Sequence, residues 1–261
     1  MTNSLAGRVA VVTASSRGMG RGIAEHFLAE GASVVISGRT EETGAKALAE
    51  LGAGERAVAF ACDARDQTQV EALIGNAAAH FGRLDILVNC AGGSDGFALI
   101  HEMTDAAWGN AMDFVLNSAF WGTRRALPHM LSNGFGRIIN ISSIEGKQGN
   151  KANVAHYIAA KHGLNGLTKA TAFEYGARGI TCNAICPGAV ETVTFQELGG
   201  EYARQSGLTY DEFKRVYTDE SPLGRLNTVD EVAALAVLLA SEPGGGINGS
   251  LINVDGGAVP Y

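Results

Sequence analysis

The chain has 261 residues, 46% of them hydrophobic and 18% charged, and carries a formal net charge of −7. An acidic chain without a basic run is not expected to bind nucleic acid or an anionic membrane surface. No apolar run reaches the ~18 residues of a membrane span, and residues 1–7 lack the pattern of a signal peptide. We therefore expect a cytoplasmic protein.

Strand-like and helical runs alternate along the whole chain. The expected strands are residues 9–13, 33–37, 57–61, 84–89, 137–141, 180–186 and 251–254. The main expected helices are residues 21–30, 41–51, 67–81, 105–131 and 153–175. Continuously apolar strands suit a parallel sheet that is covered on both faces. The alternation predicts one α/β domain over residues 1–261, a doubly wound (Rossmann) fold with a seven-stranded parallel sheet.

Residues 191–225 interrupt this alternation after the sixth strand. They include Gly199-Gly200 and a charged helical stretch at residues 210–217. The segment follows the edge of the sheet where parallel-sheet proteins bind ligands. Long connections at that edge usually cover a substrate, so we predict a substrate lid, with a plain surface insertion as the alternative.

The first strand-to-helix turn, from Thr13 to Gly20, consists mostly of small residues. Small residues allow backbone amides and a helix N-terminus to approach a pyrophosphate. The spacing is Ala-x3-Gly-x-Gly and not the common Gly-x-Gly-x-x-Gly fingerprint. The turn predicts a dinucleotide site, and the alternative is a glycine-rich turn that binds no nucleotide.

Gly38-Arg39 follows the second strand, where an NAD enzyme usually carries Asp or Glu for the ribose 2′-hydroxyl. Two guanidinium groups, of Arg17 and Arg39, could instead hold a 2′-phosphate. The pair favours NADP(H) as cofactor over NAD(H). The alternative interpretation is two solvated surface arginines.

Tyr157 and Lys161 are four residues apart in an alanine-rich helical run, so they share one helix face. A lysine ammonium one turn away favours the phenolate, which predicts a pKa of Tyr157 below its usual value of about 10. Such a pair suits acid–base chemistry. An interfacial tyrosine beside a solvated lysine would have the same spacing, so the context must decide.

Cysteine and histidine spacings indicate neither a disulfide framework nor a metal site. His156 and His162 point to different helix faces, and no second cysteine pair completes a zinc pattern. We expect the cysteines to be small buried apolar residues. They are Cys62, Cys90, Cys182 and Cys186.

Several segments, spread in order over nearly the whole chain, form one set. They are Thr13-Ala14-Ser15-Ser16-Arg17-Gly18-Met19-Gly20, Asn89-Cys90-Ala91-Gly92, Leu116-Asn117-Ser118, Asn140-Ile141-Ser142-Ser143, Tyr157 with Lys161, Pro187-Gly188 and Asp255-Gly256-Gly257. This set resembles the short-chain dehydrogenase/reductase family, and within it 3-hydroxybutyrate dehydrogenases and 3-oxoacyl reductases. Two positions depart from the family pattern: Ala14 replaces a glycine and Cys90 replaces an asparagine.

The resemblance implies four catalytic residues. Tyr157 would exchange a proton with the substrate oxygen, and Lys161 would hold the cofactor ribose and lower the pKa of Tyr157. Ser143 would hydrogen-bond the same substrate oxygen, and Asn117 would hold a water in a proton relay. Taken singly, Ser143 could be a turn or N-cap hydroxyl and Asn117 a locally bonded helix amide.

The resemblance also implies a large set of cofactor contacts and a homotetramer. Asp63 could alternatively be only a turn former at the end of a strand. The expected cofactor-binding residues are Ser15, Ser16, Arg17, Gly18, Met19, Gly20, Arg39, Cys62, Asp63, Ala64, Asn89, Ala91, Gly92, Tyr157, Lys161, Pro187, Gly188, Val190 and Thr192.

Ser94, Glu145, Val154 and Ala189 match substrate-pocket positions of the resembled enzymes. Glu145 would repel a substrate carboxylate, so we expect a neutral, medium-sized, cyclic or hydroxylated alcohol or ketone. The expected function is an NADP(H)-dependent oxidoreductase that interconverts a secondary alcohol and a ketone. An NAD-dependent catabolic hydroxy-acid or polyol dehydrogenase and a non-catalytic NADP(H)-sensing protein are the alternatives.

Overall fold

The computed structural model describes residues 3–93, 95–205 and 207–259, so the expected substrate residue Ser94 lies outside the described residues. Seven parallel strands form one sheet in the order β3-β2-β1-β4-β5-β6-β7. The strands are β1 (Val9–Val12), β2 (Ser33–Gly38), β3 (Ala57–Ala61), β4 (Ile86–Asn89), β5 (Gly136–Ile141), β6 (Ile180–Pro187) and β7 (Leu251–Val254). The predicted doubly wound fold and its seven-stranded sheet are confirmed.

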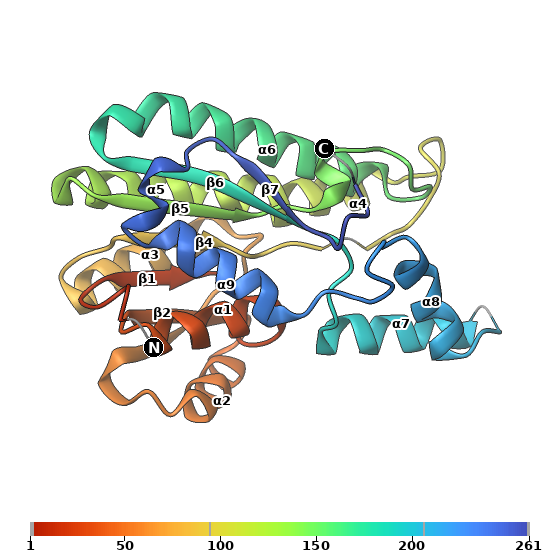
Figure 1. Cartoon of the computed structure of the whole chain (residues 1–261), viewed down its shortest axis with the longest axis horizontal. Helices are drawn as coiled ribbons and strands as arrows, with labels where there is room; N and C mark the ends of the chain where they lie inside the picture. The colour runs from red at the N-terminus through yellow and green to blue at the C-terminus, as the bar shows by residue number, and fades with distance from the viewer. Residues whose placement is uncertain (1–2, 94, 206, 260–261) are drawn as a thin grey trace.

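Helices cover both faces of this sheet (Figure 1). They are α1 (Gly18–Ala29), α2 (Glu41–Leu51), α3 (Gln67–Phe81), α4 (Asp105–Ala111), α5 (Ser118–Asn133), α6 (Ala155–Tyr175), α7 (Val193–Gln205), α8 (Tyr210–Asp219) and α9 (Val229–Ala240). Short helical segments are η1 (Gly54–Arg56), η2 (Met112–Asn117), η3 (Ile144–Gly146), η4 (Gly176–Arg178) and η5 (Pro243–Gly246). In the described ranges, none of the helices is long and apolar enough to cross a membrane.

Successive strand residues point to opposite faces of the sheet, and this alternation builds two cores. Val12 packs in one core with Phe27 of α1 and Leu239 of α9. Its neighbour Val11 packs in the other core with residues of α3 and α5, among them Leu73. Both faces of the strands are therefore buried, which explains why they are continuously apolar.

The strand order reverses between β1 and β4: β2 and β3 follow on one side, and β5, β6 and β7 on the other. Doubly wound sheets bind ligands in the crevice at the carboxyl ends of the strands at such a reversal. The glycine turn after β1 and the Asn89–Gly92 segment after β4 both lie there.

The single helix expected over residues 105–131 is three consecutive pieces. The middle piece, η2, is a π-helix that ends at Asn117, and α5 continues from it to Asn133. π-helical turns inside a helix often mark functional sites.

Helices α7 and α8 lie beyond one end of the sheet and form most of the interrupting segment 191–225 (Figure 1). Three aromatic rings pack the two helices together: Phe195 lies 5.5 Å from Phe213 and 5.3 Å from Tyr217 between ring centroids. A capping box of Thr209 with Glu212 begins α8.

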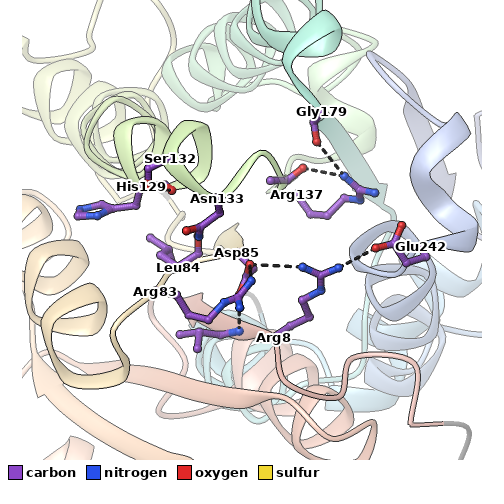
Figure 2. Close-up of polar contacts among 12 residues, drawn as sticks. Arg8, Arg83, Leu84, Asp85, His129, Ser132, Asn133, Arg137, Gly179 and Glu242 are labelled. Carbon is purple, nitrogen blue, oxygen red and sulfur yellow. Dashed lines mark hydrogen bonds and ion pairs between the residues drawn. The ribbon is translucent and has the colours of Figure 1, made fainter.

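A buried charge joins strands at the other end of the sheet. Asp85 is fully buried just before β4, and its carboxylate accepts the backbone N–H of Val9 at 2.9 Å. Arg83 donates to both carboxylate oxygens, at 2.8 and 2.7 Å (Figure 2). Arg8 adds an ion pair with Asp85 at 3.6 Å and a hydrogen bond to Glu242.

The four cysteines form no disulfide. Cys62, Cys182 and Cys186 are buried, as expected, whereas Cys90 is only partly buried. Burial raises the pKa of the Cys62 thiol to about 12, which makes that side chain an inert apolar residue at neutral pH.

Candidate active site

The turn between β1 and α1 forms a cradle of backbone groups. Gly18, the first residue of α1, has a φ of +61°, a left-handed conformation that favours glycine. A Cβ on Gly20 would approach the carbonyl oxygen of Ala14 to 2.8 Å, so only glycine fits there without a shift. The first N–H groups of α1, which have no partner inside the helix, lie in this turn, and such a helix N-terminus favours an anion.

Ala14 itself has a φ of +50°, in the left-handed region. This is the position where the resembled family carries glycine, and an alanine there is strained. The surrounding hydrogen bonds hold it: Ser37 Oγ accepts the N–H of Ala14 at 2.9 Å, and Ser15 Oγ accepts the N–H of Ser37 at 3.0 Å. The departure from the family pattern is thus accommodated by Ser37, which sequence reasoning did not single out.

Thr13 fastens the segment after β4 to the end of β1. Its hydroxyl accepts the N–H groups of Cys90 at 2.9 Å and of Ala91 at 3.1 Å. The Asn89 side chain points elsewhere: its amide donates to Asn140 at 2.8 Å and to Thr123 at 3.2 Å in the interior. The side chain of Asn89 therefore braces β4, β5 and α5, while the backbone after it lines the crevice.

The expected Ser143, Tyr157 and Lys161 come together at the carboxyl end of β5. Ser143, after β5, hydrogen-bonds the Tyr157 hydroxyl, and its Oγ also accepts the N–H of Glu145 at 3.1 Å. Lys161 is almost fully buried and donates to the carbonyl oxygen of Ile141 at 2.7 Å. Its ammonium lies 5.5 Å from the centre of the Tyr157 ring.

Lys161 also faces the segment after β4. A Cβ on Gly92 would lie 3.1 Å from the Lys161 ammonium nitrogen. The backbone at Gly92 and the side chain of Lys161 therefore border the same small space, although 69 residues separate them in the chain.

The predicted lowering of the pKa of Tyr157 is wrong in direction. Burial raises the pKa of Tyr157 to about 12, and this outweighs the lowering by the Ser143 hydrogen bond; the Glu145 charge raises it further. Burial likewise lowers the pKa of Lys161 to about 8. The spacing of Tyr157 and Lys161 shows the neighbouring charge, but the loss of solvent around both groups arises only in the folded chain.

Asn117 lies at the end of the π-helical η2, which packs against α6. Its amide donates to the Asp113 carboxylate one turn earlier, at 2.7 Å. The local bond expected as an alternative for Asn117 is therefore present. Similarly, Ser143 caps the short η3 helix as well as bonding Tyr157.

Glu145 is the least satisfied polar group of this region. The residue is 6% exposed, and neither carboxylate oxygen has a hydrogen-bond partner among the described residues. The Lys151 ammonium lies 3.6 Å from Oε1, and the Glu145 charge acts on Tyr157. A buried carboxylate without a hydrogen-bond donor is costly, so Glu145 keeps unused acceptor capacity beside Tyr157.

The segment after β6 completes the crevice. A Cβ on Gly18 would lie 3.9 Å from the Cβ of Thr192, so this segment borders the start of α1. Val190 and Thr192 are buried, and the Thr192 hydroxyl accepts the N–H of Phe195 at the start of α7. The expected substrate residues Ala189 and Val154 are partly buried.

Near the end of β2, Arg39 is exposed and makes no hydrogen bond or ion pair within the described part of the chain. Arg17 is also exposed but pairs with Glu197 of α7 at 3.0 Å. Beside them, Asp63 Oδ1 accepts the N–H of Arg65, which is the turn role considered as an alternative. Cys62 and Ala64 are buried next to it.

These features fit a dinucleotide. The glycine cradle and the N-terminus of α1 would hold the pyrophosphate, and Arg39 offers a guanidinium at the adenosine end. Lys161 and the Gly92 backbone border the place where the nicotinamide half would lie.

Comparisons with known proteins agree with this geometry. A family model described as enoyl-(acyl carrier protein) reductase matches residues 13–259. D-beta-hydroxybutyrate dehydrogenase of Cupriavidus necator is 39% identical over 257 residues, which cover 98% of this chain and 99% of the relative. The chain belongs to the short-chain dehydrogenase/reductase family. The family resemblance seen in the sequence is thereby confirmed.

Two further short-chain dehydrogenases/reductases are closely similar. 3beta-hydroxysteroid dehydrogenase 2 of Eggerthella lenta is 36% identical over 259 residues, which cover 98% of this chain and 96% of the relative. A crystal structure of an actinorhodin polyketide ketoreductase variant with NADPH has a TM-score of 0.91 at 36% identity, covering 97% of this chain and 98% of that one. The protein is thus an oxidoreductase of hydroxyl or keto substrates, from a family that uses NAD(P)H.

Lys151 and Thr13 were missed as site residues by sequence reasoning. Thr13 was visible only as the first residue of the glycine turn. Nothing in the sequence could reveal Lys151, because the carboxylates around it lie at positions 145 and 220 and meet only in the folded chain.

Proposed function

We propose that the protein is an NADP(H)-dependent carbonyl reductase that interconverts a neutral secondary alcohol and its ketone. The observation that carries the proposal is the meeting of Ser143, Tyr157 and Lys161 at the carboxyl end of β5, next to the strand-order reversal. When bound, the nicotinamide cofactor supplies or accepts the hydride.

In this proposal Ser143 and Tyr157 hold the substrate oxygen between two hydroxyl groups. Tyr157 gives its proton to that oxygen during ketone reduction and takes it back during alcohol oxidation. The raised pKa of Tyr157, about 12, keeps the proton on the hydroxyl at neutral pH and so favours its role as the acid in reduction. Lys161 binds the cofactor ribose, and Asn117 positions a water that returns the proton from solvent.

Cofactor choice is proposed to depend on Arg39. In Arg39→Asp we expect the affinity for NADPH to fall roughly 10- to 100-fold, because a charge-assisted hydrogen bond to the 2′-phosphate is lost. NADH should then bind at least as tightly as NADPH. Fluorescence titration with both cofactors measures this, with Lys46→Asp on the exposed face of α2 as the matched control.

If wild-type protein binds NADH as tightly as NADPH, and Arg39→Asp changes neither affinity, the Arg39 proposal fails. An NAD-linked catabolic dehydrogenase of hydroxy acids or polyols would then be the better reading. A protein that binds NADPH but turns over no alcohol or ketone would favour the sensing function.

Glu145 is proposed to select neutral substrates over anionic ones. Acetoacetate should be reduced at least tenfold less efficiently than neutral cyclic ketones such as cyclohexanone or 1-tetralone, because a buried carboxylate repels another. The related hydroxysteroid enzyme is named for a neutral cyclic alcohol, whereas the hydroxybutyrate enzyme is named for an anion.

Steady-state kcat/KM for the three ketones measures this selection. Glu145→Gln should narrow the difference by raising acetoacetate reduction relative to that of cyclohexanone. Equal efficiency for acetoacetate and the neutral ketones in the wild type would contradict the proposed role of Glu145.

We further propose that residues 1–261 form one domain, that residues 191–225 act as a substrate lid, and that the protein is a homotetramer. Exposed aromatic side chains on consecutive helices support the assembly: Trp108 of α4, Phe120 of α5 and Phe173 of α6 are 45%, 41% and 92% exposed. Sedimentation analysis tests the oligomeric state.

A further inference from the structure

Lys151 occupies an unusual position between the site and the α7–α8 segment. It lies in the loop between η3 and α6, and its side chain is 30% exposed. Its ammonium lies 3.6 Å from Glu145 Oε1 on one side and 3.3 Å from Glu220 Oε2 on the other. It also lies 4.9 Å from the centre of the Tyr217 ring, near the end of α8.

The two carboxylates belong to different parts of the protein. Glu145 is in η3, two residues after Ser143, and its side chain is 8% exposed. Glu220 directly follows α8 and is 44% exposed. One ammonium thus contacts a buried carboxylate of the site and a solvated carboxylate of the α7–α8 segment.

We propose that Lys151 is a positioning residue that holds the C-terminal end of α8 next to η3 by bridging Glu145 to Glu220 and Tyr217. The two contacts of Lys151 differ in their exposure to solvent. The contact with Glu220 is exposed and weak, so it can open and close. The contact with Glu145 is shielded from solvent, and Glu145 has no hydrogen-bond donor to replace it among the described residues.

The α7–α8 segment has other contacts, both within itself and with the body. Lys214 pairs with Glu191 within the segment itself, and Arg17 pairs with Glu197 at the α7 end. Ser221 donates to the carbonyl oxygen of Gly256 at 3.2 Å, just beyond Glu220. Lys151 and Ser221 thus hold the same end of α8, and loss of Lys151 would loosen α8 while Ser221 still anchors the chain beyond it.

A second consequence rests on the proposed role of Tyr157 as acid and base. The charged groups near Tyr157 are Glu145 and Lys161, and those near Lys151 are Glu145 and Glu220. Lys151 offsets the Glu145 charge that disfavours the phenolate. Without Lys151, the Glu145 charge acts more strongly on Tyr157 at alkaline pH, where alcohol oxidation needs the phenolate.

Hydrogen exchange of α8 tests the bridge without any turnover. In Lys151→Met, amides of residues 210–219 should exchange roughly two- to fivefold faster, the range expected for loss of a partly exposed charge contact. Glu220→Gln should give a similar increase, and Lys151→Arg should restore slow exchange. Lys169→Met, an exposed lysine of α6, is the matched control and should change nothing.

The pH profile of cyclohexanol oxidation with NADP⁺ provides the second measurement. Lys151→Met should move the apparent pKa of kcat upward by roughly half a unit, whereas Glu220→Gln should raise KM and leave that pKa unchanged. Loss of a lysine with only a structural role would leave the apparent pKa of kcat unchanged. It would also not speed hydrogen exchange in α8 selectively.

Exchange of α8 that is identical in Lys151→Met and wild type would overturn the bridge. Faster exchange in a protein without oxidoreductase activity would keep the bridge and overturn the proposed function instead. Equal pH profiles of Lys151→Met and wild type, with active enzyme, would refute the electrostatic link to Tyr157.

Discussion

Replacing Tyr157 by phenylalanine is expected to reduce kcat for ketone reduction about 1,000-fold, within the 10²–10⁴ range of general acid catalysis. Only the hydroxyl oxygen is removed, and the ring still packs against Val115 and Leu164. Affinity for NADPH should therefore change less than about twofold, and the melting temperature should stay near that of wild type.

Tyr175→Phe is the matched control for this experiment. It removes a hydroxyl from the last residue of the same helix, α6, far from Ser143. It should retain wild-type kcat. Full activity in Tyr157→Phe would contradict the acid–base role and would turn attention to Ser143 or to a bound water as the proton donor.

Asp85→Ala is expected to lower the free energy of unfolding by about 3 kcal/mol, at the lower end of the range for breaking a buried ion pair. The carboxylate is fully buried, and it accepts from Val9 and twice from Arg83. Alanine would leave Arg83 without its carboxylate partner and Arg8 with only Glu242 (Figure 2). Both arginines are partly exposed, which limits the loss.

For a chain of this length, about 3 kcal/mol corresponds to a decrease in melting temperature of roughly 6–12 °C. Differential scanning calorimetry measures it. The Glu242 side chain, a partner of Arg8, is 69% exposed, so Glu242→Gln should give no measurable decrease in melting temperature. If Asp85→Ala melts within about 2 °C of wild type, the network contributes little to stability.

Asp85→Ala and Tyr157→Phe change residues at opposite ends of the same sheet. Asp85 lies before β4, at the amino ends of the strands, whereas Tyr157 lies by their carboxyl ends. Asp85→Ala should therefore leave kcat unchanged at temperatures where the protein stays folded. Such independence would show that stability and chemistry depend on opposite edges of the fold.

The sequence by itself determined the fold and the family. Continuously apolar strands such as β1 can only be covered on both faces, and the glycine turn needs small residues wherever a backbone must approach an anion. Tyr157 and Lys161 could be named from their local spacing, and Ser143 from the segment in which the chain resembles the family. All of these features are local patterns, which one chain displays without its folded contacts.

Only the tertiary structure decided the electrostatics of the site. The pKa of Tyr157 is raised and not lowered, because burial, which no spacing reveals, outweighs the neighbouring charge. The side chain of Asn89 turned inward to Asn140, and Ala14 took a left-handed conformation that Ser37 holds. Lys151 contacts two carboxylates, at positions 145 and 220, that are distant from each other in the sequence. Solvent exclusion and contacts between distant residues exist only in the folded chain, so composition and spacing could not supply them.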